Sequence, residues 1–156
     1  MKNKKYELLK DDAVASFGRT LYRIKATTDF GNVKKGELGG YIEKEENLSY
    51  LGNAWVTDNA RVTGNALVTG DAWVTYNARV TGDARVSELG DVIVFKNNWS
   101  SGRHFTYTKS NKMWKVGCFY GTGEELIAKA YKDSEVSGKN YESYVNLVLE
   151  LEKIDE

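Results

Sequence analysis

The segment from Gly52 to Ser87 repeats one pattern of polar and hydrophobic positions six times without a gap. Each six-residue repeat resembles GNAWVT: a corner pair, most often Gly-Asn or Gly-Asp, then alanine, a variable residue, valine and a hydroxyl residue. Side chains alternate along a strand, so the alanine and valine point to the same side. Glycine, asparagine and aspartate tolerate the backbone of a sharp corner. The pattern therefore predicts short parallel strands joined by tight corners, with three repeats closing one coil around an alanine and valine core.

The variable residue between alanine and valine should point away from that core, so residues three repeats apart should stack on one outer face. One such column contains Trp55, Trp73 and, beyond a two-residue insertion, Ile93. A contiguous exposed apolar surface usually marks a partner, so this column predicts a subunit interface. The alternative is that a terminal segment folds back over the tryptophans. A second column places Arg61 over Arg79, and these side chains repel unless an acid, a partner or an anionic ligand lies between them.

The segments that flank the repeats predict caps, because the open ends of such an array expose unpaired strand edges. Residues 1–45 should form an N-terminal β cap, and residues 46–95 should form the repeats, including less regular copies at each end. Residues 96–156 should form a β-hairpin and two helices, the first starting at a capping box of Thr122 and Glu125. The predicted fold is mainly β and forms one compact unit.

The repeat carries a specific resemblance, because an aliphatic residue is followed four positions later by a small one, as in Val56 and Ala60. This pattern resembles the hexapeptide repeat of left-handed parallel β-helices, best known from trimeric acyltransferases. The resemblance implies a short left-handed β-helix and a homotrimer. General rules of chain topology do not give that handedness, because parallel crossovers are normally right-handed.

The flanks resemble small bacteriophage and prophage accessory proteins. The matching segments are GRTLYRIKA (18–26), KKGELGGYIEKEENLS (34–49) and WSSGRHFTYTKSNKMWKVGCFYGTGEEL (99–126). This resemblance implies a bacterial cytosolic setting but supplies no catalytic residues. Phage proteins of this size often bind a host protein or sequester a nucleotide signal, so it implies a role in counter-defence.

Composition narrows the classes of partner. The 156 residues contain 22 basic and 22 acidic side chains, so nothing suggests an extended nucleic acid or an anionic membrane. The single cysteine, Cys118, excludes an internal disulfide and fits a reducing cytosol. The sequence shows no signal peptide and no long apolar run, so a cytoplasmic location is expected. Without a cysteine pair or a convergent acidic cluster, neither a metal site nor a cofactor is expected.

Positive charge is nevertheless concentrated after the repeats. Residues 96–115 carry five lysines and arginines and no acid, interleaved with aromatic residues. Such a segment can stack a base and hold a phosphate, although a hairpin that buries its aromatic residues would have the same composition. The candidate ligand-binding residues are Trp99, Arg103, His104, Tyr107, Lys109, Trp114 and Lys115.

Three functions remain open from the sequence. The leading one is binding without catalysis, with an anionic nucleotide-like ligand or a host protein as the target. The alternative is an acyltransferase-like enzyme, because hexapeptide acyltransferases typically use a histidine as general base and His104 is the only histidine. The third is a structural module whose repeats template oligomers.

Overall fold

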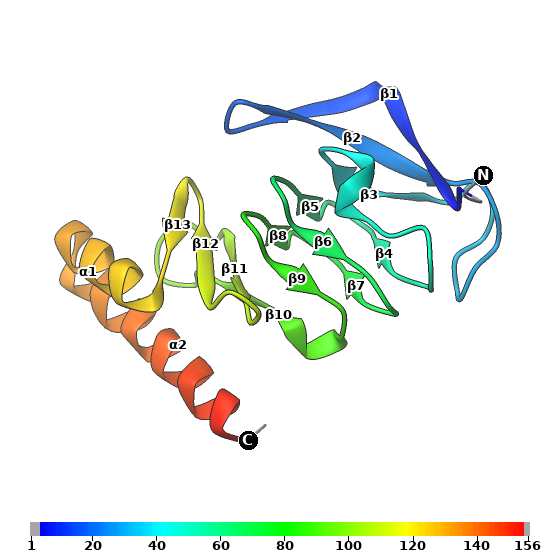
Figure 1. Ribbon diagram of the computed structural model, residues 1–156. Coiled ribbons are helices and arrows are strands. Elements are labelled where there is room, and N and C mark those ends of the chain that lie inside the picture. The colour runs from blue at the N-terminus through cyan, green and yellow to red at the C-terminus, as the bar shows by residue number, and fades with distance from the viewer. Residues whose placement is uncertain (1–3, 155–156) are drawn as a thin grey trace.

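The computed structural model describes residues 4–154 and places four parts one after another (Figure 1). An antiparallel N-terminal hairpin comes first, followed by short parallel strand pairs, a four-stranded antiparallel sheet and two C-terminal helices. Apart from the repeats, the strands are β1 (Tyr6–Ser16), β2 (Arg19–Ala26), β3 (Leu38–Ile42), β10 (Val92–Lys96), β11 (His104–Thr108), β12 (Met113–Val116) and β13 (Phe119–Gly121). The repeat strands are β4 (Trp55–Val56), β5 (Arg61–Val62), β6 (Leu67–Val68), β7 (Trp73–Val74), β8 (Arg79–Val80) and β9 (Arg85–Val86).

Each repeat strand pairs in parallel with the strand three repeats later. The pairs are β4 with β7, β5 with β8, and β6 with β9, and they place Trp55 beside Trp73 and Arg61 beside Arg79. The alanine and valine of every repeat are at most 1% exposed and belong to one core cluster. The corners include Asp58 and Tyr76 with positive φ, as a sharp turn requires. The predicted stacking of the repeats and the direction of their side chains are therefore confirmed.

The N-terminal part covers the open end of the first three repeats. Strand β3 pairs in parallel with β5, so the hairpin sheet continues into the repeats in the order β1-β2-β3-β5-β8. Three donors satisfy alanine carbonyls of these repeats: Lys5 Nζ to Ala54 (2.7 Å), the Tyr41 N–H to Ala60 (3.0 Å) and Asn47 Nδ2 to Ala66 (2.9 Å). Asn47 lies in the short helix η1 (Glu45–Asn47). Each of three sides of the end thus receives a hydrogen-bond donor, which a buried carbonyl edge needs.

Lys5 gives the first testable prediction. Its side chain is nearly fully buried, and burial lowers its pKa from 10.5 to about 8. Between pH 8 and 10.5 the unfolded chain therefore binds more protons at Lys5 than the folded chain, and folding becomes more favourable as pH rises. The unfolding free energy of the wild type relative to Lys5→Met should increase by on the order of 2 kcal/mol from pH 7 to pH 10. Urea denaturation at several pH values measures this difference, and a pH-independent difference would contradict it.

At the C-terminal end of the repeats, the structure differs from the one that the sequence predicted. The insertion after Ser87 forms a short helix, η2 (Leu89–Asp91), in which Asp91 accepts hydrogen bonds from the Ser87 and Glu88 N–H groups. The chain then enters β10, which pairs antiparallel with β11, so Ile93 lies opposite Tyr107 and does not extend the tryptophan column. The prediction that the repeats resume after the insertion is wrong, because this turn redirects the chain into the antiparallel sheet.

The antiparallel sheet has two differently covered faces. From β10, Val92 and Val94 pack against the repeat core, whereas Ile93 and Phe95 pack against a second cluster beneath the helices. Helix α1 (Gly123–Asp133) begins at the predicted Thr122 and Glu125 capping box, and α2 (Glu135–Ile154) follows after one residue. Within residues 4–154, no helix has the length and apolar character needed to cross a membrane.

Candidate functional site

Arg61 and Arg79 lie beside each other on the paired strands β5 and β8, on the outer side of the repeats. Both side chains are half-buried. Among the described residues, neither guanidinium forms an ion pair with a carboxylate. The acid that could have separated the two charges is therefore not supplied by the described part of the chain, and both arginines present unneutralised charge.

The C-terminal sheet adds two more cations to the same place. Arg103 precedes β11, and Lys115 lies in β12. Burial, followed by the charges of Arg61 and Arg103, lowers the pKa of the Arg79 guanidinium. Burial and then the charge of Arg79 lower the pKa of Lys115. We call Arg61, Arg79, Arg103 and Lys115 the arginine face, in which Arg79 is surrounded by like charges.

Two adjoining hollows open on the arginine face, and both are lined by Phe17, Arg61 and Arg79. The larger hollow, of about 490 Å³, also includes Arg103, His104 and the amides of Asn59 and Asn77. The smaller one, of about 110 Å³, also includes Lys115 and the hydroxyls of Thr63 and Thr81. Of the described residues that line them, none is acidic. The volume of the larger hollow is in the range of pockets that bind small molecules.

The tip of the β1–β2 hairpin supplies an aromatic ring. In Figure 1 the hairpin runs along the repeats, and its tip extends toward the C-terminal sheet. Phe17 at this tip has a positive φ of 48° and is 59% exposed. Lys115 Nζ lies 4.2 Å from the centre of the Phe17 ring, and Arg79 Cζ lies 5.8 Å from it. Both distances are within the range of cation–π attraction, so the hairpin tip is tied to the arginine face.

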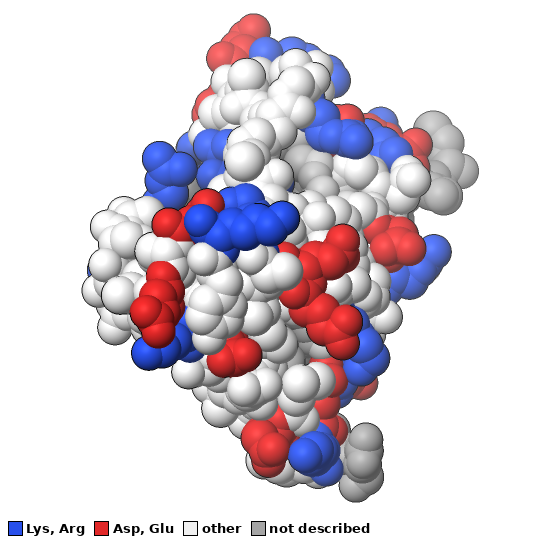
Figure 2. Space-filling model, turned by 90° about the vertical axis from the view of Figure 1, so that its left-hand side faces the viewer, with Lys and Arg blue, Asp and Glu red and all other residues white. Residues whose placement is uncertain are grey.

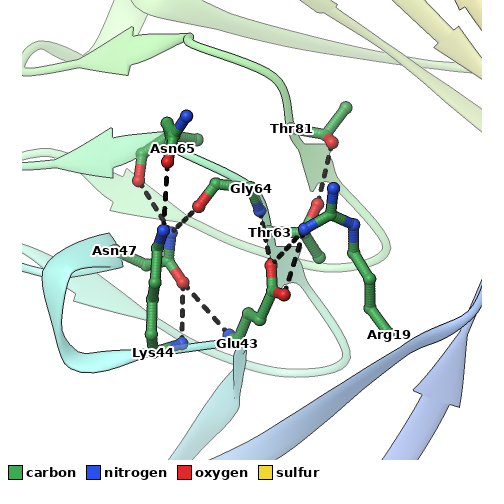
Figure 3. Close-up of polar contacts among 9 residues, drawn as sticks. Arg19, Glu43, Lys44, Asn47, Thr63, Gly64, Asn65 and Thr81 are labelled. Atoms are coloured by element: carbon green, nitrogen blue, oxygen red, sulfur yellow. Dashed lines mark hydrogen bonds and ion pairs between the residues drawn. The ribbon is translucent and has the colours of Figure 1, made fainter.

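A network beside the tip of the hairpin holds it in place (Figure 3). Arg19 Nη1 donates to both carboxylate oxygens of Glu43, at 2.8 and 3.0 Å, and the Gly64 N–H donates to Glu43 Oε1 at 2.7 Å. Although partial burial alone would raise the pKa of Glu43, the hydrogen bond from Gly64 and the contact with Arg19 lower it. Arg19, which also lines the smaller hollow, is thus neutralised, unlike the arginine face.

Basic side chains are grouped locally on the surface of this molecule. Figure 2, which turns the left-hand side of Figure 1 toward the viewer, shows Lys and Arg in separate groups with Asp and Glu between them. The whole chain has a formal net charge of zero. A site built on a local cluster suits a compact anion better than an extended polyanion, which binds along a continuous basic surface.

Three of the predicted ligand-binding residues come together on or beside the arginine face, namely Arg103, His104 and Lys115. The sequence also identified the column of Arg61 and Arg79 but did not connect it to this segment. Phe17 was missed altogether. The Phe-Gly pair at a hairpin turn was its only sequence signal, and that pair does not indicate which face the turn approaches.

The other predicted ligand-binding residues are elsewhere. Tyr107 and Trp114 were expected to offer stacking faces, which is wrong, because they are 3% and 2% exposed and pack beneath the helices. The Tyr107 hydroxyl donates to the Glu152 carboxylate. Trp99 packs on the Tyr141 ring, and Lys109 follows β11; neither lines the two hollows. Strand alternation turned Tyr107 and Trp114 toward the helices.

The three residues of the predicted interface column lie in different environments in the structure. Trp55 is fully buried against Tyr6 and Phe30, with ring centroids 6.4 and 5.3 Å apart, so its assignment to an exposed interface is wrong. The N-terminal part folds over it, as the alternative interpretation proposed. Trp73 remains partly exposed, whereas Ile93 packs against the aromatic cluster beneath the helices.

The His104 ring contacts an amide, with its Nδ1 3.1 Å from Asn77 Nδ2. If Nδ1 accepts from this amide, the neutral ring carries its proton on Nε2 and has no free nitrogen to act as a base. Within residues 4–154, no group of three or more histidine, cysteine, aspartate and glutamate side chains is placed to hold a metal ion.

No protein-family model matches the chain, and no curated protein is detectably similar to it in sequence.

Proposed function

We propose that this protein binds a small phosphate-bearing, nucleotide-like anion on the arginine face and carries out no reaction on it. The supporting observation is the environment of Arg79: a half-buried guanidinium beside Arg61, Arg103 and Lys115, without an acid lining the hollows among the described residues. A bound oxyanion replaces this repulsion with attraction. Guanidinium groups match the geometry of phosphate through paired hydrogen bonds.

We also propose the setting that the resemblances imply. The repeats form a short left-handed β-helix, the protein assembles as a homotrimer, and it is a phage or prophage accessory protein of the bacterial cytosol. There it captures its ligand in counter-defence. The parallel pairing across three repeats supports the β-helix, and the alanine and valine columns support it as well.

Two measurements test the binding proposal. Native mass spectrometry of protein purified from bacterial cells should detect a retained anionic ligand together with the subunit number. Calorimetric titration with phosphate, pyrophosphate and a panel of nucleotides should give binding that weakens about tenfold in Arg103→Ala, because a hydrogen bond to a charged group contributes about 1.5–3 kcal/mol. Absence of a ligand in the first measurement and of heat in the second would contradict the proposal and leave a host protein or a structural role.

The homotrimer gives a separate prediction. If the partly exposed Trp73 lies at the subunit contact, Trp73→Glu should yield monomers, because burying an unpaired carboxylate at a contact is unfavourable. Leu67→Glu is the matched control, since Leu67 occupies the same repeat position on β6, on another side. Light scattering measures the mass. A trimer that persists in Trp73→Glu would place the contact elsewhere, and a monomeric wild type would contradict the homotrimer.

The acyltransferase alternative rests on His104, which lines the larger hollow. If the protein only binds its ligand, His104→Ala should retain most of the wild-type affinity and biological effect. Acetyl-CoA turnover that is present in the wild type and lost in His104→Ala would instead favour the enzyme. Titration of both proteins with the nucleotide panel, alongside an assay for free coenzyme A, decides between the two.

A further inference from the structure

We infer that the ligand is a nucleoside diphosphate or triphosphate, held with its phosphates on the arginine face and its base against the hairpin tip at Phe17. This inference rests on the proposed function and specifies the chemistry of its ligand. It follows from the different linings of the two adjoining hollows, which share Phe17, Arg61 and Arg79. A ligand that occupies both must carry a charged end and a planar end.

The charge of the site indicates more than one phosphate. The arginine face carries four positive charges, and no acid lines either hollow among the described residues. A phosphomonoester brings about −1.5 to −2 charges at pH 7, so a single phosphate leaves about half of the positive charge uncompensated. A chain of two or three phosphates comes closer to neutralising all four cations.

The positions of the cations suit such a chain. Arg61 and Arg79 lie on paired strands, which are about 4.8 Å apart, so their guanidinium groups can contact successive phosphates. Lys115 lies at the smaller hollow and Arg103 at the larger one, which extends the positive charge in both directions. Thr63 Oγ1 and Thr81 Oγ1 are 2.8 Å apart (Figure 3). One hydroxyl hydrogen is used between them, so the other is free to donate to a phosphate oxygen.

The larger hollow has the groups that a base requires. Phe17 presents an exposed ring at a hairpin tip that the adjacent contact between Arg19 and Glu43 fixes. Asn59 and Asn77 occupy the same position in repeats three apart, so both amides line this hollow. Among the described residues, the Asn59 side chain has no hydrogen-bond partner, so it offers both a donor and an acceptor to the edge of a base. Stacking on an aromatic ring tolerates any base, so Phe17 favours a nucleoside in general.

The test is calorimetric titration with inorganic triphosphate and with adenosine, guanosine, cytidine and uridine mono- and triphosphates. Affinity should rise at least tenfold from the best monophosphate to its triphosphate. The best nucleoside triphosphate should bind about tenfold more tightly than inorganic triphosphate, as a stacked base implies. Phe17→Leu should abolish the difference in affinity between the nucleoside triphosphate and inorganic triphosphate, and Phe17→Tyr, which keeps a ring, should retain that difference.

The possible outcomes test the base site, the polyphosphate and the proposed function separately. If inorganic triphosphate binds but no nucleoside increases its affinity, or Phe17→Leu changes nothing, the base site is wrong and the proposed anion binding stands. If a monophosphate binds as tightly as its triphosphate, the inferred polyphosphate is wrong. If none of these anions binds, the proposed function fails as well. Arg85→Ala is the control, because Arg85 has the same repeat position as Arg61 and Arg79 but lies on β9, and it should bind like the wild type.

Discussion

Trp55→Ala should lower the free energy of unfolding by about 3–5 kcal/mol, the usual loss when a buried tryptophan is truncated. Trp55 is fully buried where the N-terminal part meets the repeats, and it contacts the rings of Tyr6 and Phe30. The backbone at Gly39 approaches so closely that a Cβ there would lie 2.8 Å from the Trp55 ring. Small domains are stable by only about 5–15 kcal/mol, so this loss is a large fraction of the total free energy of unfolding.

Two variants make the prediction specific. Trp73→Ala removes the same side chain from the same repeat position three repeats later, where it is only partly buried, so its loss should be clearly smaller. Trp55→Phe keeps an aromatic ring and removes the indole Nε1, which is buried and has no hydrogen-bond partner within residues 4–154. Its loss should therefore be smaller than that of Trp55→Ala. Urea denaturation followed by circular dichroism measures all three, and equal losses for Trp55→Ala and Trp73→Ala would contradict the structure at this cap.

Arg79→Met should have opposite effects on binding and on stability. Arg79 lines both hollows, so the variant should bind the anionic ligand at least tenfold more weakly, given about 1.5–3 kcal/mol for one charged hydrogen bond. The ligand-free variant should nevertheless unfold at a higher temperature than the wild type. Removing the guanidinium removes its burial and its repulsion from Arg61 and Arg103, which are the causes that lower its pKa. Such a gain is typical when a residue kept for function is replaced.

Arg85→Met is the matched control for this pair of effects. Arg85 is exposed and lines neither hollow of the arginine face, so neither affinity nor melting temperature should change appreciably. Calorimetric titration and thermal denaturation of the same three preparations measure both quantities. A lower melting temperature for ligand-free Arg79→Met would indicate that Arg79 stabilises the fold through a contact of its own, and would weaken the assignment of a ligand site.

Features that depend on local pattern could be predicted from the sequence. The six-residue period established the short strands, their pairing across three repeats and the burial of alanine and valine, because strand alternation and corner residues act within a few positions. The same period placed Arg61 beside Arg79. The Thr122 and Glu125 spacing determined where α1 begins, since a capping box is a local hydrogen-bonding motif.

The segments that cover each face of the repeats could not be predicted from local pattern. Trp55 and Trp73 have the same local sequence pattern, yet one is buried under Phe30 and the other is partly exposed. Phe17 reaches the arginine face because β3 pairs with β5 and so extends the hairpin sheet along that side. These contacts join segments distant in the chain, and no periodicity encodes them. Which of these contacts form depends on how the surfaces of the caps and the repeats fit together, and this is a property of the whole fold.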